Sequence, residues 1–334
     1  MRTWMLLCDP SVGSDGERTR QTETKQEKQT QTQKRAETRP CYAPEVTQLD
    51  ASSPTPDADQ LTAEQLQELL DIALTLATEA GELVAARRKE GVAVADTKSS
   101  SVDIVTASDR ESEAHIRRRL EELRPGDGFF GEESDATAST TGLTWVVDPI
   151  DGTVNYLYGY PNYAVSVAVV VGDPGSEPAS FTTLASAVVN PEGRESFTAM
   201  RGQGSWCNGV QLRVDAAPPL EFALVGTGFS YSAERRVQQA EQWKTLAGRV
   251  RDLRRVGAAS LDLCNIAINR LDAYYESGLN PWDHAGAALV AREAGAVVVG
   301  EGLGREGRRL IIAAKPGLEL ELADLVTVLP GAGL

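Results

Sequence analysis

The 334-residue sequence is poor in cations and in long apolar runs, and each shortage excludes a class of protein. Lys and Arg together number 33 against 48 Asp and Glu, which gives a formal net charge of −15. A chain this acidic lacks the basic patch that sequence-independent binding to nucleic acid or to an anionic membrane surface requires. No run of about 18 or more apolar residues is present, which argues against a membrane-spanning helix. We therefore expect no nucleic-acid partner and no membrane partner.

Cysteine is also scarce, with four residues that are widely scattered along the chain. They form no C-x-x-C pair and no cluster, so neither a zinc knuckle nor a disulfide scaffold is indicated. The apolar stretch that begins at Met1 is too short for the hydrophobic region of a signal peptide, because Asp9 and Pro10 follow at once. The sequence therefore predicts a cytoplasmic protein.

The first 60 residues differ in composition from the rest. Between Gly16 and Pro40 the chain is almost entirely Gln, Thr, Lys, Arg and Glu. Such a segment cannot bury enough apolar area to offset its ordering entropy. We expect residues 1–60 to form a disordered polar extension, which is either a solvated tail or a partner-binding segment, and order to begin near Leu61.

Two amphipathic helices are expected to follow this extension. Thr62 and Gln65 have the spacing of a capping box, and apolar residues then recur on one helical face until the chain reaches Gly91. A second helix is predicted to start with the same spacing at Ser108 and Glu111 and to stop near residue 125. Residues 98–101, between the two helices, have the composition of a flexible loop.

After the second helix the periodicity changes from helical to alternating. Residues 164–171 are apolar on both faces of a strand, as expected for a strand buried between two layers. Strands and helices then alternate without a simple βαβ repeat, which indicates an α/β fold with sheets sandwiched between helix layers, built as two halves with a cleft. We expect further strands at residues 185–190, 195–200, 222–225, 271–276 and 296–299, and helices at 233–250, 260–269, 284–293 and 318–329.

The segment 144–156 carries the clearest chemical signal. An apolar strand runs into Asp148, and Pro149 ends it because proline lacks a backbone donor. Asp148 and Asp151 then flank a tight bend where both carboxylates can converge. Gly152 and Thr153 follow where a helix can begin, so their N–H groups would point at a bound anion.

Similar acids follow other apolar segments. Glu132 and Glu133 come directly after Phe129-Phe130, and Asp283 opens a predicted helix. Asp-Pro and Asp-Gly are also common turn dipeptides, so one aspartate could be an Asx-turn or a helix cap. Several acids in this arrangement are better explained by a hard divalent cation such as Mg²⁺, which prefers oxygen ligands.

These motifs resemble the paired signatures of the inositol monophosphatase family, a group of Mg²⁺-dependent, lithium-sensitive phosphatases that includes fructose-1,6-bisphosphatase. The matching segments are Gly131-Glu-Glu133, Asp148-Pro-Ile-Asp-Gly-Thr153 and Trp282-Asp283-x-Ala285-Gly286. The resemblance covers about Leu61 to Leu329. It implies an α/β sandwich with alternating α-β-α-β-α layers and one catalytic domain at residues 61–330. The metal and phosphate half would span about 61–215 and the substrate half about 216–330.

The resemblance also implies roles for individual residues. The catalytic residues would be Glu132 and Thr153, which position and activate the attacking water, with Asp109 in the outer metal shell. Two or three Mg²⁺ ions would be bound. Lys98 matches a lysine in a mobile loop of the family near the third metal position. The metal ligands would be Glu132, Asp148, Asp151, Asp283 and the carbonyl of Ile150, and the substrate contacts would be Gly152, Thr153, Ala259, Glu276 and Lys98.

The implied reaction is hydrolysis of a phosphomonoester by direct in-line attack of water, without a covalent phosphoenzyme. The favoured substrate is inositol-1-phosphate or a related polyol monophosphate, because Glu276 occupies the position of a hydroxyl-binding glutamate and 257–260 resembles the turn beside the inositol ring. Glu276 could instead simply end a strand at the surface. Alternatives are phosphatases of histidinol phosphate, fructose-1,6-bisphosphate or 3′-phosphoadenosine 5′-phosphate, and a catalytically inert regulatory protein on the same fold. A homodimer is expected from the resemblance alone.

The two histidines are weaker candidates. His284 adjoins Asp283 and is a possible general base, but neighbouring side chains on a helix diverge by about 100°. An outer-shell or solvent-facing position is therefore favoured for His284. His115 lies among charged residues, and we expect it to be solvated.

Overall fold

The fold is described from a computed structural model, in which residues 58, 61–92, 94–98, 104–176 and 180–326 are placed. Apart from Ala58, the predicted extension 1–60 lies outside the described residues, as do 99–101 of the predicted loop and 327–329 of the last predicted helix. The described helices are α1 (Ala63–Glu90), α2 (Ala107–Leu123), α3 (Thr153–Tyr158), α4 (Ala233–Ala247), α5 (Ala259–Ala267), α6 (Pro281–Glu293) and α7 (Leu318–Leu325), with the 3₁₀ turns η1 (Leu220–Phe222) and η2 (Glu301–Leu303).

Strands form two larger sheets and one small ribbon. The seven-stranded sheet has the order β3-β4-β5-β6-β7-β8-β9 and is antiparallel except between β3 and β4. Its strands are β3 (Gly128–Gly131), β4 (Leu143–Asp151), β5 (Ala164–Asp173), β6 (Ser180–Asn190), β7 (Glu195–Met200), β8 (Gly204–Cys207) and β9 (Val210–Gln211).

The five-stranded sheet has the order β11-β10-β12-β14-β13. Strand β10 runs parallel to both of its neighbours, whereas β14 is antiparallel to β12 and to β13. Its strands are β10 (Leu224–Thr227), β11 (Asp252–Arg254), β12 (Ala273–Glu276), β13 (Val297–Val299) and β14 (Ile311–Ala314), and the separate ribbon pairs β1 (Val94–Thr97) with β2 (Ile104–Thr106).

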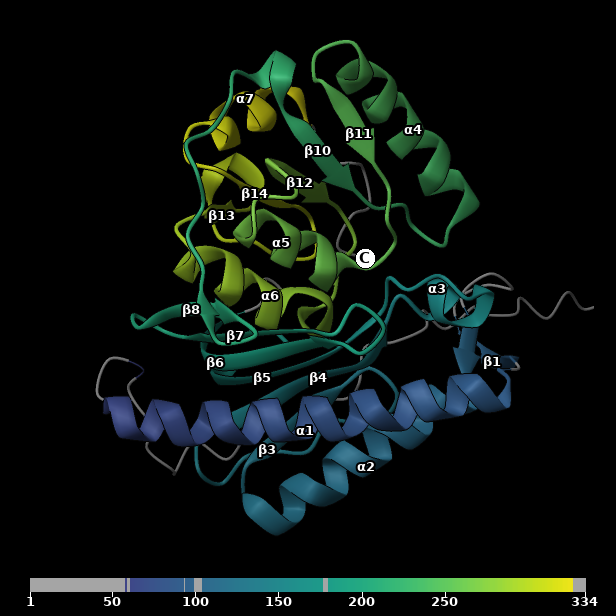
Figure 1. Cartoon of the computed structure of the whole chain (residues 1–334), viewed down its shortest axis with the longest axis vertical. Coiled ribbons are helices and arrows are strands. Elements are labelled where there is room, and N and C mark those ends of the chain that lie inside the picture. Colours follow the sequence, from purple (N-terminus) through teal and green to yellow (C-terminus); the bar gives the residue numbers. More distant parts are fainter. Residues whose placement is uncertain (1–57, 59–60, 93, 99–103, 177–179, 327–334) are drawn as a thin grey trace, which may run out of the picture. The chain divides into compact units, whose positions relative to one another are not determined.

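Figure 1 shows five layers within residues 61–326. Helices α1 and α2 cover the outer face of the seven-stranded sheet, α5 and α6 lie between the two sheets, and α4 and α7 cover the far face of the five-stranded sheet. The predicted α/β fold with α-β-α-β-α layers is confirmed. None of the helices described is long and apolar enough to cross a membrane.

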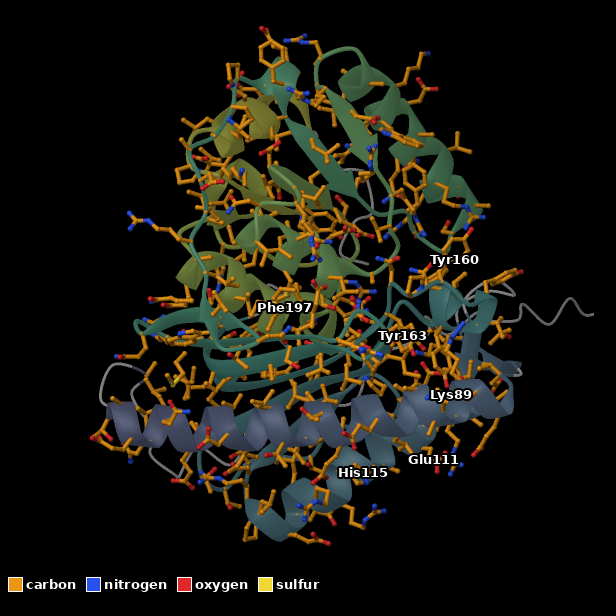
Figure 2. The ribbon with its side chains drawn as sticks, in the orientation of Figure 1. Lys89, Glu111, His115, Tyr160, Tyr163 and Phe197 are labelled. Atoms are coloured by element: carbon orange, nitrogen blue, oxygen red, sulfur yellow. The ribbon has the colours of Figure 1, made fainter. Side chains whose placement is uncertain are left out.

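The core consists of apolar clusters on both faces of the seven-stranded sheet. The β5 residues Val165, Val167 and Val169 are fully buried and pack against α1, while the other face of β5 is buried too, as predicted. Burial of each such side chain contributes roughly 1.5–3 kcal/mol. Phe197 of β7 lies in the cluster formed with α5 and α6 (Figure 2). Two-sided burial explains the apolar run in β5.

Several boundaries differ from the sequence prediction. Thr62 caps α1 with Gln65, as predicted. Helix α2, however, begins at Ala107 with Thr106 as its N-cap, and the carboxylate of Asp109 accepts a hydrogen bond from the Thr106 N–H at 2.8 Å, so the predicted cap at Ser108 is wrong. Strand β4 continues through Pro149 to Asp151, so the predicted strand end at Pro149 is wrong. Strands β1, β2, β8, β9, β11 and β14 were not predicted, and Phe222 lies in η1 and not in a strand. These elements are too short to show a clear period.

Candidate functional site

The ends of two parallel strands bring Glu132 and Asp148 together. In the register of β3 and β4, Gly131 lies opposite Val147, so the next residues of the two strands are also neighbours. The ladder of β4 with β5 is interrupted between Asp148 and Asp151. At this interruption the Ile150 N–H donates to Asp148 Oδ1 at 3.1 Å, which holds the carboxylate at the bend.

Helix α6 brings Asp283 to the same end of the sheet. Its first turn is fixed by Asp283 Oδ2, which accepts a hydrogen bond from the N–H of the N-cap Asn280 at 2.6 Å. One turn later, Gly286 lies so close to β5 that a Cβ there would be 2.9 Å from Ser166 Oγ. Because Ser166 pairs with Asp148 across the ladder, this close packing places the start of α6 beside the β4 carboxylate.

Asp151 is directed toward α5. Its carboxylate accepts hydrogen bonds from the Ala259 N–H at 3.2 Å, from the Ser260 N–H at 2.7 Å and from Ser260 Oγ at 2.5 Å. The N–H groups at the start of a helix are free to bind an anion. In this structure that anion is the carboxylate of Asp151, from the seven-stranded sheet. The N–H of Ala259, which was predicted as a substrate contact, therefore donates a hydrogen bond to Asp151.

The start of α3 lies directly after these acids. Gly152, the N-cap residue, has φ +88°, and a Cβ there would be 2.9 Å from the Asn162 carbonyl oxygen, so only glycine fits without strain. The Thr153 hydroxyl lies 3.1 Å from Asp109 Oδ1 and 3.0 Å from the Ile150 carbonyl oxygen. The sequence prediction of a helix start at this point is confirmed, and Asp109 and Thr153 are in contact.

A tyrosine anchors α3 on α1. The hydroxyl of the fully buried Tyr156 donates to the Val84 carbonyl oxygen at 2.9 Å and is hydrogen-bonded with Ser108 Oγ at 3.0 Å. Since α1 packs along the seven-stranded sheet, these bonds fix the position of α3 relative to that sheet.

Lys98 forms ion pairs with two of the acids. Its Nζ atom is 2.7 Å from Glu132 Oε1 and 2.5 Å from Glu133 Oε1. Glu113 of α2 also holds the loop after β3, because its carboxylate accepts a hydrogen bond from the Glu133 N–H at 2.8 Å. A Cβ at Gly131 would be 2.3 Å from Glu113 Oε2, so the glycine leaves room for this buried acid.

Burial and mutual repulsion govern the electrostatics of the site. The pKa of Asp148 is raised well above its usual range. The main cause is burial, and the charges of Glu132, Asp151 and Asp283 add to it. Burial likewise raises the pKa of Asp283, with further contributions from Glu132 and Asp151. For Asp151 burial outweighs the bonds from α5 and raises the pKa to about 6. The carboxylates are thus within electrostatic reach of one another.

Glu276 faces this acid group from the end of β12. The hydroxyl of the fully buried Tyr274 donates a hydrogen bond to Glu276 Oε2. Burial raises the pKa of Glu276 to about 7, and the nearby Arg255 opposes this rise while Asp151 adds to it. Glu276 is the last residue of β12 and is half-buried, and it lies within electrostatic reach of Asp151 on β4.

Comparison with known proteins identifies the family of this chain. The model of the inositol monophosphatase family matches residues 65–324. The chain is also 42% identical over 279 residues to the inositol-1-monophosphatase SuhB of Mycobacterium tuberculosis, which covers 76% of this chain and 91% of that protein. The chain belongs to the inositol monophosphatase family.

Two further relatives of this family bear on function and fold. A Nus factor SuhB of Haemophilus influenzae is 35% identical over 235 residues, which covers 70% of this chain and 85% of that protein. The crystal structure of the extragenic suppressor protein suhB from Bartonella henselae matches with a TM-score of 0.71 at 29% identity, covering 79% of this chain and 99% of that one. Membership of the inositol monophosphatase family supports a phosphatase activity.

Proteins of the inositol monophosphatase family are generally metal-dependent, and the donor chemistry here fits a metal. Four carboxylates from β4, α6 and the loop after β3 offer only oxygen ligands, as a hard divalent cation requires. As they lie, however, Asp151 is bonded to α5 and Glu132 is paired with Lys98. Within the described part of the chain, no three His, Cys, Asp or Glu side chains form a group that could hold a metal ion. The individual ligands therefore stay a prediction.

Sequence reasoning missed the residues that support the site. Glu113 was detectable in principle, since Asp109 and Glu113 are four residues apart and so share one face of α2. The structure corrects the solvent-facing alternative for His284 and the solvated position predicted for His115. His284 is 2% exposed and stacks on Phe181, so it does not face solvent. His115 is half-buried, with its Nε2 atom 2.9 Å from Glu79 Oε2 on α1 (Figure 2).

Proposed function

We propose that this chain is a Mg²⁺-dependent phosphomonoesterase that hydrolyses inositol-1-phosphate to inositol and phosphate. The observation that carries the proposal is that acids from three separate elements, after β3, within β4 and at the start of α6, lie within electrostatic reach of one another, with α3 beginning directly after those of β4. On the second sheet, within electrostatic reach of Asp151, lies the carboxylate of Glu276, to which the proposal assigns the substrate hydroxyls. A phosphate ester of a polyol needs both parts, one for the phosphate and one for the ring.

Two or three Mg²⁺ ions, when bound, would neutralise the substrate phosphate and lower the pKa of a water molecule. The residues that would hold them are Glu132, Asp148, Asp151, Asp283 and the carbonyl of Ile150.

Thr153 and Glu132 orient the attacking water. The Thr153 hydroxyl is held by Asp109 Oδ1 and by the Ile150 carbonyl oxygen, so its oxygen lone pairs remain available to accept a hydrogen bond from water. Asp109 is fixed in turn by the N–H and hydroxyl of Thr106 at 2.8 and 2.5 Å. The N–H groups of Gly152 and Thr153 bind the phosphate oxygens, and Lys98 adds positive charge beside them.

Glu276 selects the alcohol part of the substrate. A site built to accept hydroxyl hydrogen bonds penalises a substrate that lacks them, because the Glu276 oxygen that Tyr274 does not bind is then left without a partner. The alternatives within the family are histidinol phosphate, fructose-1,6-bisphosphate and 3′-phosphoadenosine 5′-phosphate. Inhibition by lithium, a homodimeric state and a cytoplasmic location complete the proposal.

A regulatory role without catalysis is the competing function, and it is favoured by the relative that is named a Nus factor. The experiment that separates the two is phosphate release with Mg²⁺, measured for the four candidate substrates with and without lithium. The control variant is Glu132→Gln, which keeps the shape of the side chain but removes its charge. We expect release from inositol-1-phosphate that is lost in the variant. No release from any of the four esters would favour the regulatory role, and release from histidinol phosphate alone would change the substrate.

A further inference from the structure

The orientation of Glu276 is set by a tyrosine on the same strand. Strand β12 lies inside the five-stranded sheet, between β10 and β14, and residues two apart on a strand project from the same face. Tyr274 is fully buried in the cluster formed by α5 and α6, so its ring has a fixed position. Its hydroxyl donates to Glu276 Oε2. One carboxylate oxygen is therefore committed to the protein, and Oε1 remains for a ligand.

A glycine on the neighbouring strand end gives an independent measure of how tightly this carboxylate is held. Gly228 directly follows β10, and β10 pairs with β12 so that Thr227 lies opposite Tyr275. A Cβ at Gly228 would be 2.0 Å from Glu276 Oε2 and 2.2 Å from Oε1. Gly228 is not among the glycines with positive φ, so the requirement for glycine is one of space. The carboxylate is therefore held between the backbone at Gly228 and the hydroxyl of Tyr274.

We propose that Tyr274 is a positioning residue that fixes the Glu276 carboxylate for a substrate hydroxyl, and that Gly228 provides the space for it. Together they set the preference for polyol phosphates over phosphate esters without hydroxyl groups. The inference rests on the proposed function, since it concerns the alcohol end of the same site. Neither residue touches the phosphate or the acids of β4, so the rate of the chemical step should be preserved when either is changed.

The test is Tyr274→Phe, which removes only the hydroxyl, measured with inositol-1-phosphate and with p-nitrophenyl phosphate, whose alcohol part has no hydroxyl group. Without the hydrogen bond from Tyr274, Glu276 is no longer held in place for the substrate hydroxyl. We expect this loss to raise KM for inositol-1-phosphate roughly 10-fold or more. We expect kcat for inositol-1-phosphate and both constants for p-nitrophenyl phosphate to stay within about twofold. Gly228→Ala should give the same pattern, because the new methyl group displaces the same carboxylate.

Tyr275→Phe is the matched control. Tyr275 is the next residue, is also buried, and packs on the opposite face of the sheet in the cluster with α7. It should leave the ratio between the two substrates unchanged. In a Glu276→Gln background, Tyr274→Phe should cause little further loss, because the partner it positions has been altered.

The outcomes separate the inference from the proposed function. If the wild-type enzyme hydrolyses inositol-1-phosphate and Tyr274→Phe slows both substrates equally, or behaves like Tyr275→Phe, the positioning role is refuted while the function stands. The role is also refuted if the effect of Tyr274→Phe is undiminished in the Glu276→Gln background. If the wild-type enzyme hydrolyses p-nitrophenyl phosphate but not inositol-1-phosphate, the proposed substrate fails, and the polyol preference assigned to Tyr274 fails with it.

Discussion

Replacing Asp148 with asparagine should stabilise the metal-free protein while it removes activity. Asp148 is 1% exposed, and the three charges that raise its pKa most are the carboxylates of Glu132, Asp151 and Asp283. Two like charges about 5 Å apart repel by roughly 3 kcal/mol at an effective dielectric constant of about 20. Asparagine removes this repulsion and keeps the Oδ1 acceptor for the Ile150 N–H. After allowance for Lys98 and for partial protonation, we expect a gain of about 2 kcal/mol, which raises Tm by roughly 4–8 °C.

The gain should depend on pH in a defined direction. Because the pKa of Asp148 is raised in the folded protein above the ordinary value of 3.8, the folded state binds a proton that the unfolded chain releases. The contribution of the protonated Asp148 to the stability of the wild type is complete below the ordinary pKa, and it is lost as the pH rises through the raised value. The advantage of Asp148→Asn over the wild type should therefore be absent near pH 4 and largest near pH 8.

Thermal unfolding in EDTA and in saturating Mg²⁺ provides the assay. Mg²⁺ should stabilise the wild type by about 2.7 kcal/mol at a hundred times its Kd, but the variant much less, so the order of Tm values reverses. The control is Asp127→Asn, since that carboxylate accepts bonds from Trp145 Nε1 at 2.9 Å and Arg124 Nε at 3.0 Å and should lose stability on neutralisation. A lower Tm for Asp148→Asn in EDTA at pH 8 would refute the reasoning.

Three further predictions concern the surroundings of the acids. Gly152→Ala should abolish phosphate release and lower the free energy of unfolding by about 1–3 kcal/mol, because alanine at φ +88° is strained, and a structure with α3 unchanged would contradict this. Tyr156→Phe should lose about 1–2 kcal/mol in urea unfolding through its two hydrogen bonds; an unchanged midpoint would argue that these bonds contribute nothing. Lys98→Gln should lower Tm in EDTA more than in Mg²⁺, because only the metal-free acids depend on its charge, and equal losses in both would show a purely structural role.

Local patterns were sufficient where a single element explains its own sequence. The capping box at Thr62, the two-sided apolar strand β5 and the helix start at Gly152 were all predictable, since each depends on residues close in the chain. The relation between Glu132 and Asp148 was predictable only as a motif, because it depends on the parallel register of β3 with β4.

Tertiary burial explains most of what the sequence could not show. Helix α6 lies between two sheets, so His284 is buried although it adjoins an acid at the helix start. The Asp109 carboxylate caps α2 from within its first turn, by accepting the N–H of Thr106. The spacing of Ser108 and Glu111 also fits a capping box, and it predicted the wrong helix start. Strand β14 is a four-residue run, and its place beside β12 follows from sheet pairing across a separation in sequence that no local pattern records.

The bonds between Asp151 and α5 link the two halves of the site thermodynamically. Asp151 belongs to the seven-stranded sheet, whereas α5 begins within the turn 257–260, for which the proposed function predicts a place beside the alcohol end of the substrate. A cation that draws Asp151 away weakens its three bonds to α5, and a ligand that shifts α5 changes the charge that Asp151 offers to the cation. Reciprocity requires the two effects to be equal. The factor by which Mg²⁺ changes the affinity for free inositol must therefore be the factor by which inositol changes the affinity for Mg²⁺.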